Sequence, residues 1–390
     1  MSIVLQHSAP PAARRRDALA SAERTLGLLM LAALAVGAWQ GVAALSTPAA
    51  ERRLSALLDG PALLDGRAAA AVDAVESRAL PADGLLRAAG GVVRWRVFGS
   101  GGPQVAVGCG DWLFLTEELR PWPHADEAMR ARADVLAHAA AALAARNTEL
   151  VVALVPDKAR VEAGSLCGAP RSAQADARYG AFIRLLLARR VHTVDLAAPM
   201  AAARRDGPLF FRTDTHWNGR GAALAARLIA AAVTVPLGPA ARYRTERAEA
   251  ETDRPGDLLR LMGLDRVPDT FPALRPRPDR ERVERTVAVE APPPAGDLLD
   301  GAPNGDVVLL GSSFSLHSDF QGRLEEALGR PVDNVALAGG AFAGAAGRYF
   351  AGAAPDAPPR LVVWEIPERA VGQPLDSSDR ALYAELFRQR

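Results

Sequence analysis

The sequence predicts an α/β protein built on a doubly wound, mainly parallel sheet, with one apolar helix ahead of it. Five apolar runs read as buried strands: VVALVP at 151–156, TVDL at 193–196, VVLLG at 307–311, VDNVAL at 332–337 and LVVWEI at 361–366. Longer helical patterns separate these runs. Strands that are apolar on both faces and alternate with helices are typical of a parallel sheet covered on both sides.

Size and charge limit the class of protein. The chain has 390 residues, of which 49% are hydrophobic, and a formal net charge of +1. It can therefore bury at least one large core, and nothing in the charge indicates nucleic acid as a partner.

The N-terminal region predicts a membrane segment. TLGLLMLAALAVGAWQGVAAL, residues 25–45, carries no charge and matches the roughly 20 residues that cross a bilayer as a helix. Arginines at positions 14, 15, 16 and 24 favour a cytoplasmic location for residues 1–24 and export of everything after about residue 46. The alternative is a cleaved signal peptide, with Val42-Ala43-Ala44 as the processing site, and this also exports the body of the protein.

Residues 46–90 are rich in Ala, Leu and Arg and are expected to form a helical juxtamembrane linker. VVRWRVF, which begins at Val92, and WLFL at 112–115 then predict strands, so a globular domain is expected over residues 91–390. Between about 238 and 304 the alternation lapses into a stretch dense in Pro, Arg and Asp, including RPRPDRERVER and APPPAG. This stretch is expected to be an insertion with little core of its own.

The two cysteines, Cys109 and Cys167, suit an oxidising compartment in which one disulfide forms. Because sequence alone does not establish pairing, two unpaired small hydrophobic residues are the alternative.

The stretch FFRTDTHW is the first candidate for chemistry. If it is extended, side chains two residues apart share a face, so Asp214 and His216 point the same way. An aspartate in that position can fix the histidine's tautomer and stabilise its protonated form. Asn218-Gly219 then lets the chain turn into the helix GAALAARLIAAAV. Two alternatives are that Asp214 caps this helix while His216 is an ordinary polar residue, and a metal site, which is disfavoured because one Asp and one His lack further ligands.

The second candidate is VVLLGSSFSLHSDF, where an apolar strand ends at Gly311 and a helical pattern begins near Phe320. A serine in such a turn is exposed, and helix N-terminal amides favour negative charge on a reacting carbonyl oxygen. The turn is not the G-x-S-x-G elbow, so the hydrolase family with that elbow is not indicated. His317 could compete with His216 as a base, and all three serines are also plausible as helix caps: Ser312, Ser313 and Ser315.

DTHW followed by NGRGA, with GSSFS further along the chain, resembles the periplasmic alginate O-acetyltransferase family, whose catalytic domain is similar to SGNH hydrolases. GCGDWLFL, VPDK at 155–158 and VVWEIPER at 362–369 fit the same family, so the resemblance covers about residues 90 to 370. It implies a triad of Ser313 as nucleophile, His216 as base and Asp214 as orienting acid, in a permuted order because Asp and His precede Ser.

The resemblance also implies further site residues. The backbone N–H of Ser313 and the segment NVALAGG are expected to supply oxyanion donors, and two charged side chains match family positions; the candidates are Asn334, Gly339, Gly340, Lys158 and Arg369. The alternatives are a strand end with a flexible glycine turn for NVALAGG, and salt bridges for Lys158 and Arg369.

The implied function is an O-acetyltransferase that takes acetyl onto Ser313 and passes it to a hydroxyl of an exported polysaccharide, alginate-like or another exopolysaccharide, without cofactor or metal. The implied partners are that acceptor, a membrane-bound O-acyltransferase as acetyl donor, and other polysaccharide secretion components. The chain ends soon after VVWEIPER, and no C-terminal carbohydrate-binding module fits there. It therefore more nearly resembles the membrane-anchored member of the family, a single-pass protein of the bacterial inner membrane with a periplasmic domain. The alternatives are an acetyl esterase and a non-catalytic scaffold of a secretion complex.

Overall fold

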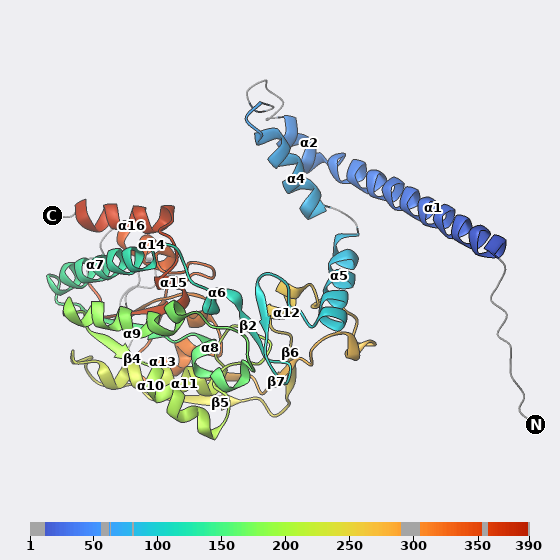
Figure 1. Ribbon diagram of the computed structural model, residues 1–390. Coiled ribbons are helices and arrows are strands. Elements are labelled where there is room, and N and C mark those ends of the chain that lie inside the picture. The colour runs from blue at the N-terminus through green and yellow to red at the C-terminus, as the bar shows by residue number, and fades with distance from the viewer. Residues whose placement is uncertain are drawn as a thin grey trace, which may run out of the picture. The chain divides into compact units, whose positions relative to one another are not determined.

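The computed structural model describes residues 12–55, 62, 64–79, 82–289, 305–352 and 358–388 (Figure 1). The chain divides into two compact units, Met1–Ala89 and Gly90–Arg390. The first unit contains α1 (Ala12–Leu45), α2 (Pro48–Ser55) and α4 (Arg67–Ala79). Within α1, residues Ala22–Leu45 are long and apolar enough to cross a membrane, by length and composition. The expected apolar N-terminal helix is therefore present.

The prediction of a strand at VVRWRVF was wrong, because these residues form the end of α5 (Asp83–Phe98). Its burial follows a helical period, with Gly91 buried and Trp95 half-buried while Val93 and Val97 are exposed. A Cβ atom at Gly91 would lie 2.4 Å from the carbonyl oxygen of Met262, so the helix approaches α12 (Asp257–Met262) closely at this glycine. Packing of this face overrides the β-propensity of the valines.

The predicted parallel sheet is confirmed. Its five strands lie in the order β10-β9-β11-β3-β4, and every neighbouring pair is parallel. The five apolar runs supply one strand each: β3 (Glu149–Val155), β4 (Thr193–Asp195), β9 (Val307–Leu310), β10 (Val332–Asn334) and β11 (Leu361–Pro367). The predicted strand at WLFL is β2 (Leu113–Leu115), which pairs antiparallel with β1 (Val105–Val107) outside this sheet.

Both faces of the sheet are covered, as a doubly wound fold requires. Alternate residues of β3 enter different cores: Leu150, Val152 and Leu154 one, and Val151, Ala153 and Val155 the other. The first core is closed by helices grouped on one side of the sheet in Figure 1: α7 (Ala125–Ala144), α9 (Ala173–Ala188), α14 (Gly344–Ala351) and α16 (Ser377–Arg388). The second is closed by α10 (Ala197–Ala203), α11 (Gly219–Ala232) and α13 (Phe320–Leu328).

The carboxyl ends of three central strands bring the candidate residues to one edge of the sheet. β9 ends at Leu310, just before the serine turn; β3 ends at Val155, just before Lys158; and β11 ends at Pro367, just before Arg369. Short helices continue from these ends: α8 (Lys158–Val161) and α15 (Glu368–Val371).

In its described part, residues 238–289, the stretch where the alternation lapses contains two antiparallel ribbons, α12 and a 3-10 helix at Pro272–Leu274. β5 (Tyr243–Arg247) pairs with β8 (Glu284–Ala288), and β6 (Thr252–Arg254) pairs with β7 (Asp279–Glu281). In the sequence α12 lies between β6 and β7, and its Leu258, Leu259 and Met262 are buried. The APPPAG segment lies outside the described residues.

Candidate active site

Asp214 and His216 meet in a loop that bends back on itself, not in the extended segment that the spacing predicted. Residues 212–216 are bends, and an isolated antiparallel bridge between Phe210 and Trp217 closes the loop. Asp214 Oδ1 accepts a hydrogen bond from His216 Nδ1 at 2.6 Å and another from the His216 amide at 2.8 Å. The two side chains are therefore paired, although the reason given by strand alternation was wrong.

The other side of the imidazole faces the serine turn. His216 Nε2 lies 2.8 Å from Ser313 Oγ. Since the Asp214 carboxylate only accepts, the hydrogen sits on Nδ1, and Nε2 is left to accept from the Ser313 hydroxyl. Asp214 and His216 are each 4% exposed, whereas Ser313 is half-buried. The structure thus brings all three predicted residues together, with only the serine open to solvent.

The local charges keep Asp214 ionised. Burial alone would raise the pKa of Asp214, but the hydrogen bonds and the charge of His216, with Arg254 beside them, hold that pKa below its usual range. Asp214 does not cap α11 either, so that alternative was wrong. α11 begins at Gly219, and the side chain of Asn218 accepts from the first amides of that helix.

A buried carboxylate decides which serine faces His216. Glu365, in the middle of β11, is fully buried and accepts from the amide and hydroxyl of Ser312, at 2.7 and 2.9 Å, and from the hydroxyl of Ser315 at 3.0 Å. Ser312 also caps the short 3-10 helix Ser313–Leu316, as the capping alternative expected. A Cβ atom at Gly311 would lie 2.1 Å from Ser315 Oγ, so only glycine fits this turn. Ser313 alone is left to point at the imidazole.

His317 is placed beside the base rather than as a rival to it. Its ring lies against that of His216, with centroids 4.0 Å apart, and its Nδ1 accepts from Arg254 Nη2 at 3.0 Å. Burial, followed by the charge that His216 carries when protonated, lowers the pKa of His317 to about 4. It is therefore neutral near pH 7 and flanks the serine–histidine pair.

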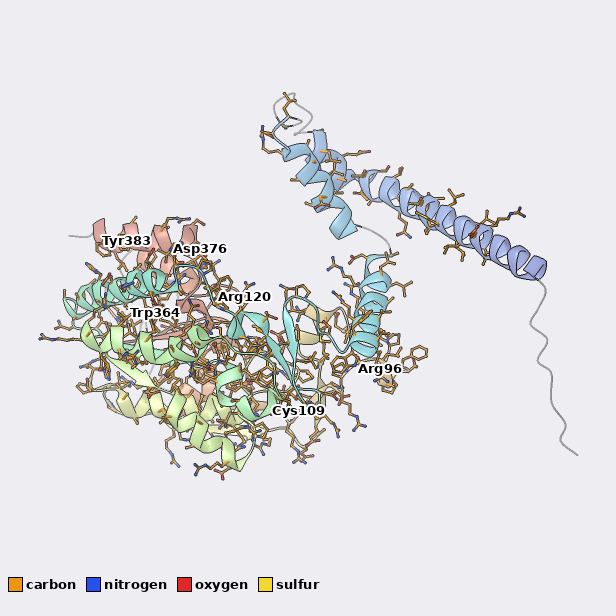
Figure 2. All side chains as sticks on the ribbon, viewed as in Figure 1. Arg96, Cys109, Arg120, Trp364, Asp376 and Tyr383 are labelled. Atoms are coloured by element: carbon orange, nitrogen blue, oxygen red, sulfur yellow. A yellow bond between two sulfur atoms is a disulfide. The ribbon has the colours of Figure 1, made fainter. Side chains whose placement is uncertain are left out.

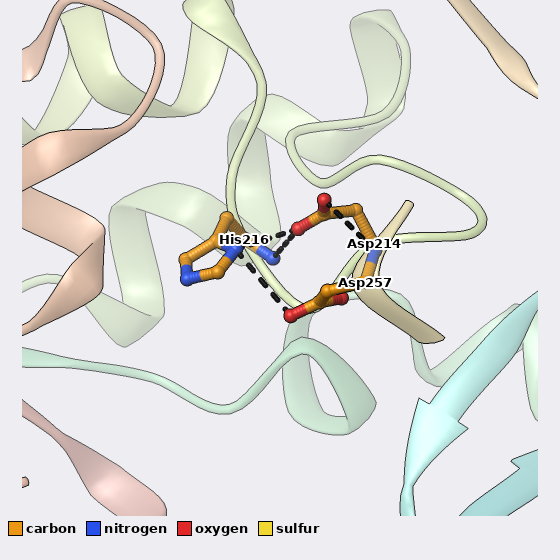
Figure 3. A group of neighbouring side chains, drawn as sticks. All are labelled: Asp214, His216 and Asp257. Carbon is orange, nitrogen blue, oxygen red and sulfur yellow. Dashed lines mark hydrogen bonds and ion pairs between the residues drawn. The ribbon is translucent and has the colours of Figure 1, made fainter. Parts of the chain in front are cut away.

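A third carboxylate that sequence reasoning missed lies beside the pair (Figure 3). Asp214, His216 and Asp257 offer atoms within 4.8 Å of one another, a spacing that a metal ion would accept. Hydrogen bonds already explain the geometry, because Asp257 accepts from the Thr215 amide at 2.8 Å and from its hydroxyl at 2.6 Å. Moreover, His216 Nδ1 carries the hydrogen that it donates to Asp214, which leaves that nitrogen no lone pair for a metal.

Lys158 is bonded to the backbone of the loop that carries Asp214 and His216 instead of facing a substrate. It is fully buried, and its ammonium donates to the carbonyls of Leu113, Arg212 and Asp214, at 2.5, 2.9 and 2.9 Å. Burial lowers the pKa of Lys158 to about 8, partly offset by Glu118 and other nearby carboxylates. All three ammonium hydrogens are used. The structure therefore contradicts a substrate-binding role for this residue and gives it a positioning role.

The predicted oxyanion donors differ in whether their N–H groups already make a hydrogen bond within the protein. Gly340 donates its amide to the carbonyl of Leu337 at 2.9 Å, so that amide is already used and the prediction for Gly340 was wrong. Gly339 has a φ of +73°, a conformation that favours glycine. Asn334 donates from Nδ2 to the Ser315 carbonyl at 2.9 Å, which ties the end of β10 to the serine turn.

Arg369 lies against the serine turn. Its guanidinium sits 5.4 Å from the centre of the Phe314 ring, and that ring lies edge-on to His216 with centroids 5.0 Å apart. Within the described residues no ion pair at 4 Å or less involves Arg369, so the salt-bridge alternative does not hold there. It is half-buried and places positive charge beside the ring of Phe314, the residue after Ser313.

The predicted Cys109–Cys167 disulfide is present. It ties the turn between β1 and β2 to the segment after α8, and the Cys109 amide adds a hydrogen bond to the Ser165 carbonyl at 3.0 Å. Figure 2 labels Cys109 at this point. The bond therefore joins the turn before β2, whose Leu113 carbonyl accepts from Lys158, to the segment that follows Lys158.

A cavity of about 550 Å³ adjoins the site. Arg254 lines it and also contacts His317, while Phe211 and Ser318 form other parts of the wall. Its remaining charged lining comes mostly from the ribbons of residues 243–288 and from the start of α11. The segment expected to be a mere insertion therefore builds one side of the hollow next to the histidine.

The family model described as "ALGX: SGNH hydrolase-like domain, acetyltransferase AlgX" matches residues 105–368, which include Asp214, His216 and Ser313. The chain belongs to this AlgX family. The resemblance inferred from DTHW and GSSFS is thereby confirmed, and with it the SGNH-like fold.

Individual relatives of this AlgX-family chain agree with the family assignment. It is 33% identical over 313 residues to "Probable alginate O-acetylase AlgJ" of Pseudomonas putida, covering 79% of this chain and 80% of the relative. It is 30% identical over 356 residues to the protein of the same name in Azotobacter vinelandii, covering 90% and 88%. The solved "O-Acetyltransferase Domain of Pseudomonas putida AlgJ" superposes with a TM-score of 0.63 at 31% identity, covering 74% of this chain and 100% of that one.

Proposed function

We propose that this AlgX-family protein is an O-acetyltransferase that carries acetyl on Ser313 and transfers it to a hydroxyl of an exported polysaccharide. The observation that carries the proposal is the line of hydrogen bonds from Ser313 Oγ through His216 to Asp214. An acceptor nitrogen 2.8 Å from a half-exposed hydroxyl, with a buried carboxylate behind it, is the arrangement that activates a serine for attack on an ester.

In the first half-reaction Ser313 Oγ attacks the carbonyl carbon of an acetyl ester while its proton passes to His216 Nε2. The new C–O bond gives a tetrahedral oxyanion, and Asp214 stabilises the imidazolium. His216 then returns the proton to the departing alcohol oxygen as the old C–O bond breaks. The product is acetyl-Ser313 and a free alcohol.

In the second half-reaction a sugar hydroxyl takes the alcohol's place. His216 Nε2 accepts its proton while its oxygen attacks the acetyl carbon. When the second tetrahedral oxyanion collapses, the bond between the acetyl carbon and Ser313 Oγ breaks, its electrons stay on Oγ, and His216 Nε2 returns the proton to Oγ. The acetyl group is then esterified to the sugar, and the serine is restored.

The oxyanion would be stabilised at the start of the 3-10 helix. Ser313 is the first residue of that helix, so its amide belongs to an N-terminus where backbone N–H groups point outward. The positive charge of Arg369 supports this assignment. Gly339 and Asn334 remain candidates for a second donor.

The acceptor is proposed to lie in the cavity beside Arg254. Five arginines and five carboxylates line that cavity: Arg220, Arg247, Arg254, Arg280, Arg282, Glu251, Asp279, Glu281, Glu284 and Asp319. Because the two signs balance, the wall offers many hydrogen bonds to hydroxyls but little net attraction for a polyanion. A hydroxyl-rich polysaccharide fits such a surface, and its own charge need not be high.

The location follows from α1 and the disulfide, which together indicate an extracytoplasmic domain. The proposed form is a single-pass protein of the bacterial inner membrane with the site in the periplasm. The relatives' names, probable alginate O-acetylases, support a polysaccharide acceptor. A membrane-bound O-acyltransferase is the proposed acetyl donor, and other secretion components are proposed partners.

The test is turnover of a chromogenic acetyl ester by the full chain in detergent, with mass spectrometry of the trapped acyl-serine. Ser313→Ala and His216→Ala should each abolish acyl-enzyme formation, and the double variant should be little worse than either, because the two act as one unit. The controls Ser378→Ala and His124→Ala change exposed residues and should retain full turnover.

Two results would contradict the proposal: wild-type turnover by Ser313→Ala, or acetyl found on Ser312 or Ser315. Adding a sugar oligomer then separates transfer from hydrolysis. A transferase yields acetylated oligomer in proportion to the alcohol released, whereas an esterase yields free acetate alone.

A further inference from the structure

The outward face of α5 is apolar. Val93 is 49% exposed and Val97 69%, and the two lie one turn apart on the same side of the helix. Leu86, two turns earlier on the same helix, is 61% exposed and continues the stripe by periodicity. Large apolar side chains scattered singly on a surface are ordinary, but a stripe along one helix face marks an interaction surface.

The opposite face of α5 contacts the domain at Gly91. Gly91 is buried against α12, and Trp95, one turn on, is half-buried. With about 100° between successive residues, these two lie roughly opposite Val93 and Val97. The inner side of the helix at Gly91 and Trp95 thus faces the rest of the domain, and Val93 and Val97 face away from it.

Two arginines border the stripe, one on each side. Arg94 and Arg96 are both exposed, and helical geometry places each about 80° from the line of Val93 and Val97. Figure 2 labels Arg96 on this helix. Among the residues that the structure describes, neither arginine has a carboxylate within ion-pair distance. An apolar stripe between unpaired arginines is typical of a helix that lies in a membrane interface.

We propose that α5 lies flat on a bilayer of anionic phospholipid, with Val93 and Val97 at the boundary of headgroups and acyl chains. Arg94 and Arg96 would reach the lipid phosphates on either side. A bilayer is the expected partner of this face, because the chain that leads into α5 contains the apolar span Ala22–Leu45, which is long enough to cross a membrane. The proposal adds to the anchoring by α1 and does not depend on acyl transfer.

The docked helix would hold the candidate site near the membrane surface. α5 packs at Gly91 on α12, and the first residue of α12 is Asp257, which binds Thr215 in the loop between Asp214 and His216. Only one helix therefore separates the proposed lipid contact from the loop that carries the base. A site held at this height meets an acetyl donor that is delivered at the bilayer.

The test uses the full chain reconstituted in vesicles of phosphatidylglycerol and phosphatidylcholine. The chain has two cysteines and both are in the disulfide, so Val93→Cys provides a single thiol for an environment-sensitive fluorophore. The emission should shift to shorter wavelength and be quenched by lipids that carry a nitroxide at headgroup depth. Leu187→Cys, an exposed apolar position on α9, is the matched control and should stay solvent-like.

Two variants sharpen the test. Replacing Arg94 or Arg96 with Ala should lower the docking equilibrium about fivefold each, as expected for about 1 kcal/mol per arginine at an anionic surface. Vesicles of phosphatidylcholine alone should reproduce the combined loss. Val97→Asp should abolish the shift at position 93 without unfolding the domain, because Val97 is exposed.

A solvent-like probe at position 93 in anionic vesicles overturns the proposal. A shifted emission without nitroxide quenching also overturns it, because it would mean that protein, such as a second copy of the chain, covers the stripe. A third probe at Leu34→Cys reports the insertion of α1 separately. Failure of anchoring is thereby distinguished from failure of docking.

Discussion

Replacing Asp214 with asparagine removes the charge behind His216 but keeps an oxygen where the histidine needs one. Both the ring Nδ1 and the amide of His216 donate to the same oxygen, Oδ1, so the asparagine carbonyl should occupy that place and preserve the tautomer. Its NH₂ group then faces the Asp257 amide, which lies 3.3 Å from Oδ2 and loses its acceptor.

The size of the effect follows from that geometry. A hydrogen bond to a charged group contributes about 1.5–3 kcal/mol, and losing that stabilisation of the imidazolium should lower kcat by about 10- to 150-fold. Asp214→Ala removes the acceptor as well. The histidine can then take the wrong tautomer, a fault that lowers kcat by about 10⁴-fold in a serine triad whose aspartate is changed to asparagine. Asp214→Asn is expected to escape this fault because two donors of His216 share the one oxygen.

The assay is steady-state turnover of a chromogenic acetyl ester, with unfolding measured in parallel. Asp269→Asn is the matched control, since its carboxylate is 91% exposed. If Asp214→Asn proved as inactive as Asp214→Ala, the amide would have turned its NH₂ toward Nδ1, and the argument from two donors on one oxygen would fail. Full activity in Asp214→Asn would show that the charge has no role.

Three further predictions concern the disulfide, His317 and the cavity. Replacing Cys109 and Cys167 with serine opens a loop of 58 residues and should cost about 4 kcal/mol of unfolding free energy; denaturant titration measures it, and no change in midpoint would contradict it. As the pH falls from 6.5 to 4, the unfolding free energy of His317→Gln should decrease less than that of the parent protein. The reason is that His317 has a folded-state pKa of about 4, so the unfolded chain binds that proton at a higher pH than the folded chain does. Equal decreases in the two proteins would contradict this. Acceptor KM should vary little with NaCl, because the cavity's charges balance; a steep rise with salt would argue for recognition of a polyanion.

The sheet could be predicted because its strands are buried on both faces and so appear as continuous apolar runs. The helix at VVRWRVF could not be predicted, since valine and tryptophan favour strands by composition while the actual period of burial is helical. Gly91 carried the missing signal, because a glycine between the apolar residues marks the close approach to α12.

The candidate site could be predicted from an Asp and a His two residues apart and from a serine that follows a buried strand. The residues that hold the site in place, Glu365 and Asp257, were not predicted. Glu365 did leave a signal in the sequence, because it is a single carboxylate inside the apolar run LVVWEI, where an unpaired charge would be costly. Asp257 left none, because its partner Thr215 is far away in the sequence and only the folded chain brings them together.

The loop that carries Asp214 and His216 is held without a helix or strand of its own. Asp279 accepts from the amides of Arg212 and Thr213, at 2.9 and 2.8 Å, and Asp257 accepts from that of Thr215. A Cβ atom at Gly256 would lie 1.9 Å from the Thr213 carbonyl oxygen, which shows how closely the two segments fit.

These contacts leave the loop little freedom. Lys158 donates hydrogen bonds to two carbonyls of the loop, and carboxylates of the 238–304 segment accept hydrogen bonds from its amides. The entropy of ordering the loop is therefore lost when the domain folds, and His216 need not reorganise when a substrate arrives. For this reason the segment that lacks strand–helix alternation is as much a part of the site as the sheet: without its carboxylates, the loop's amides would turn to water and the distance from His216 to Ser313 would no longer be fixed.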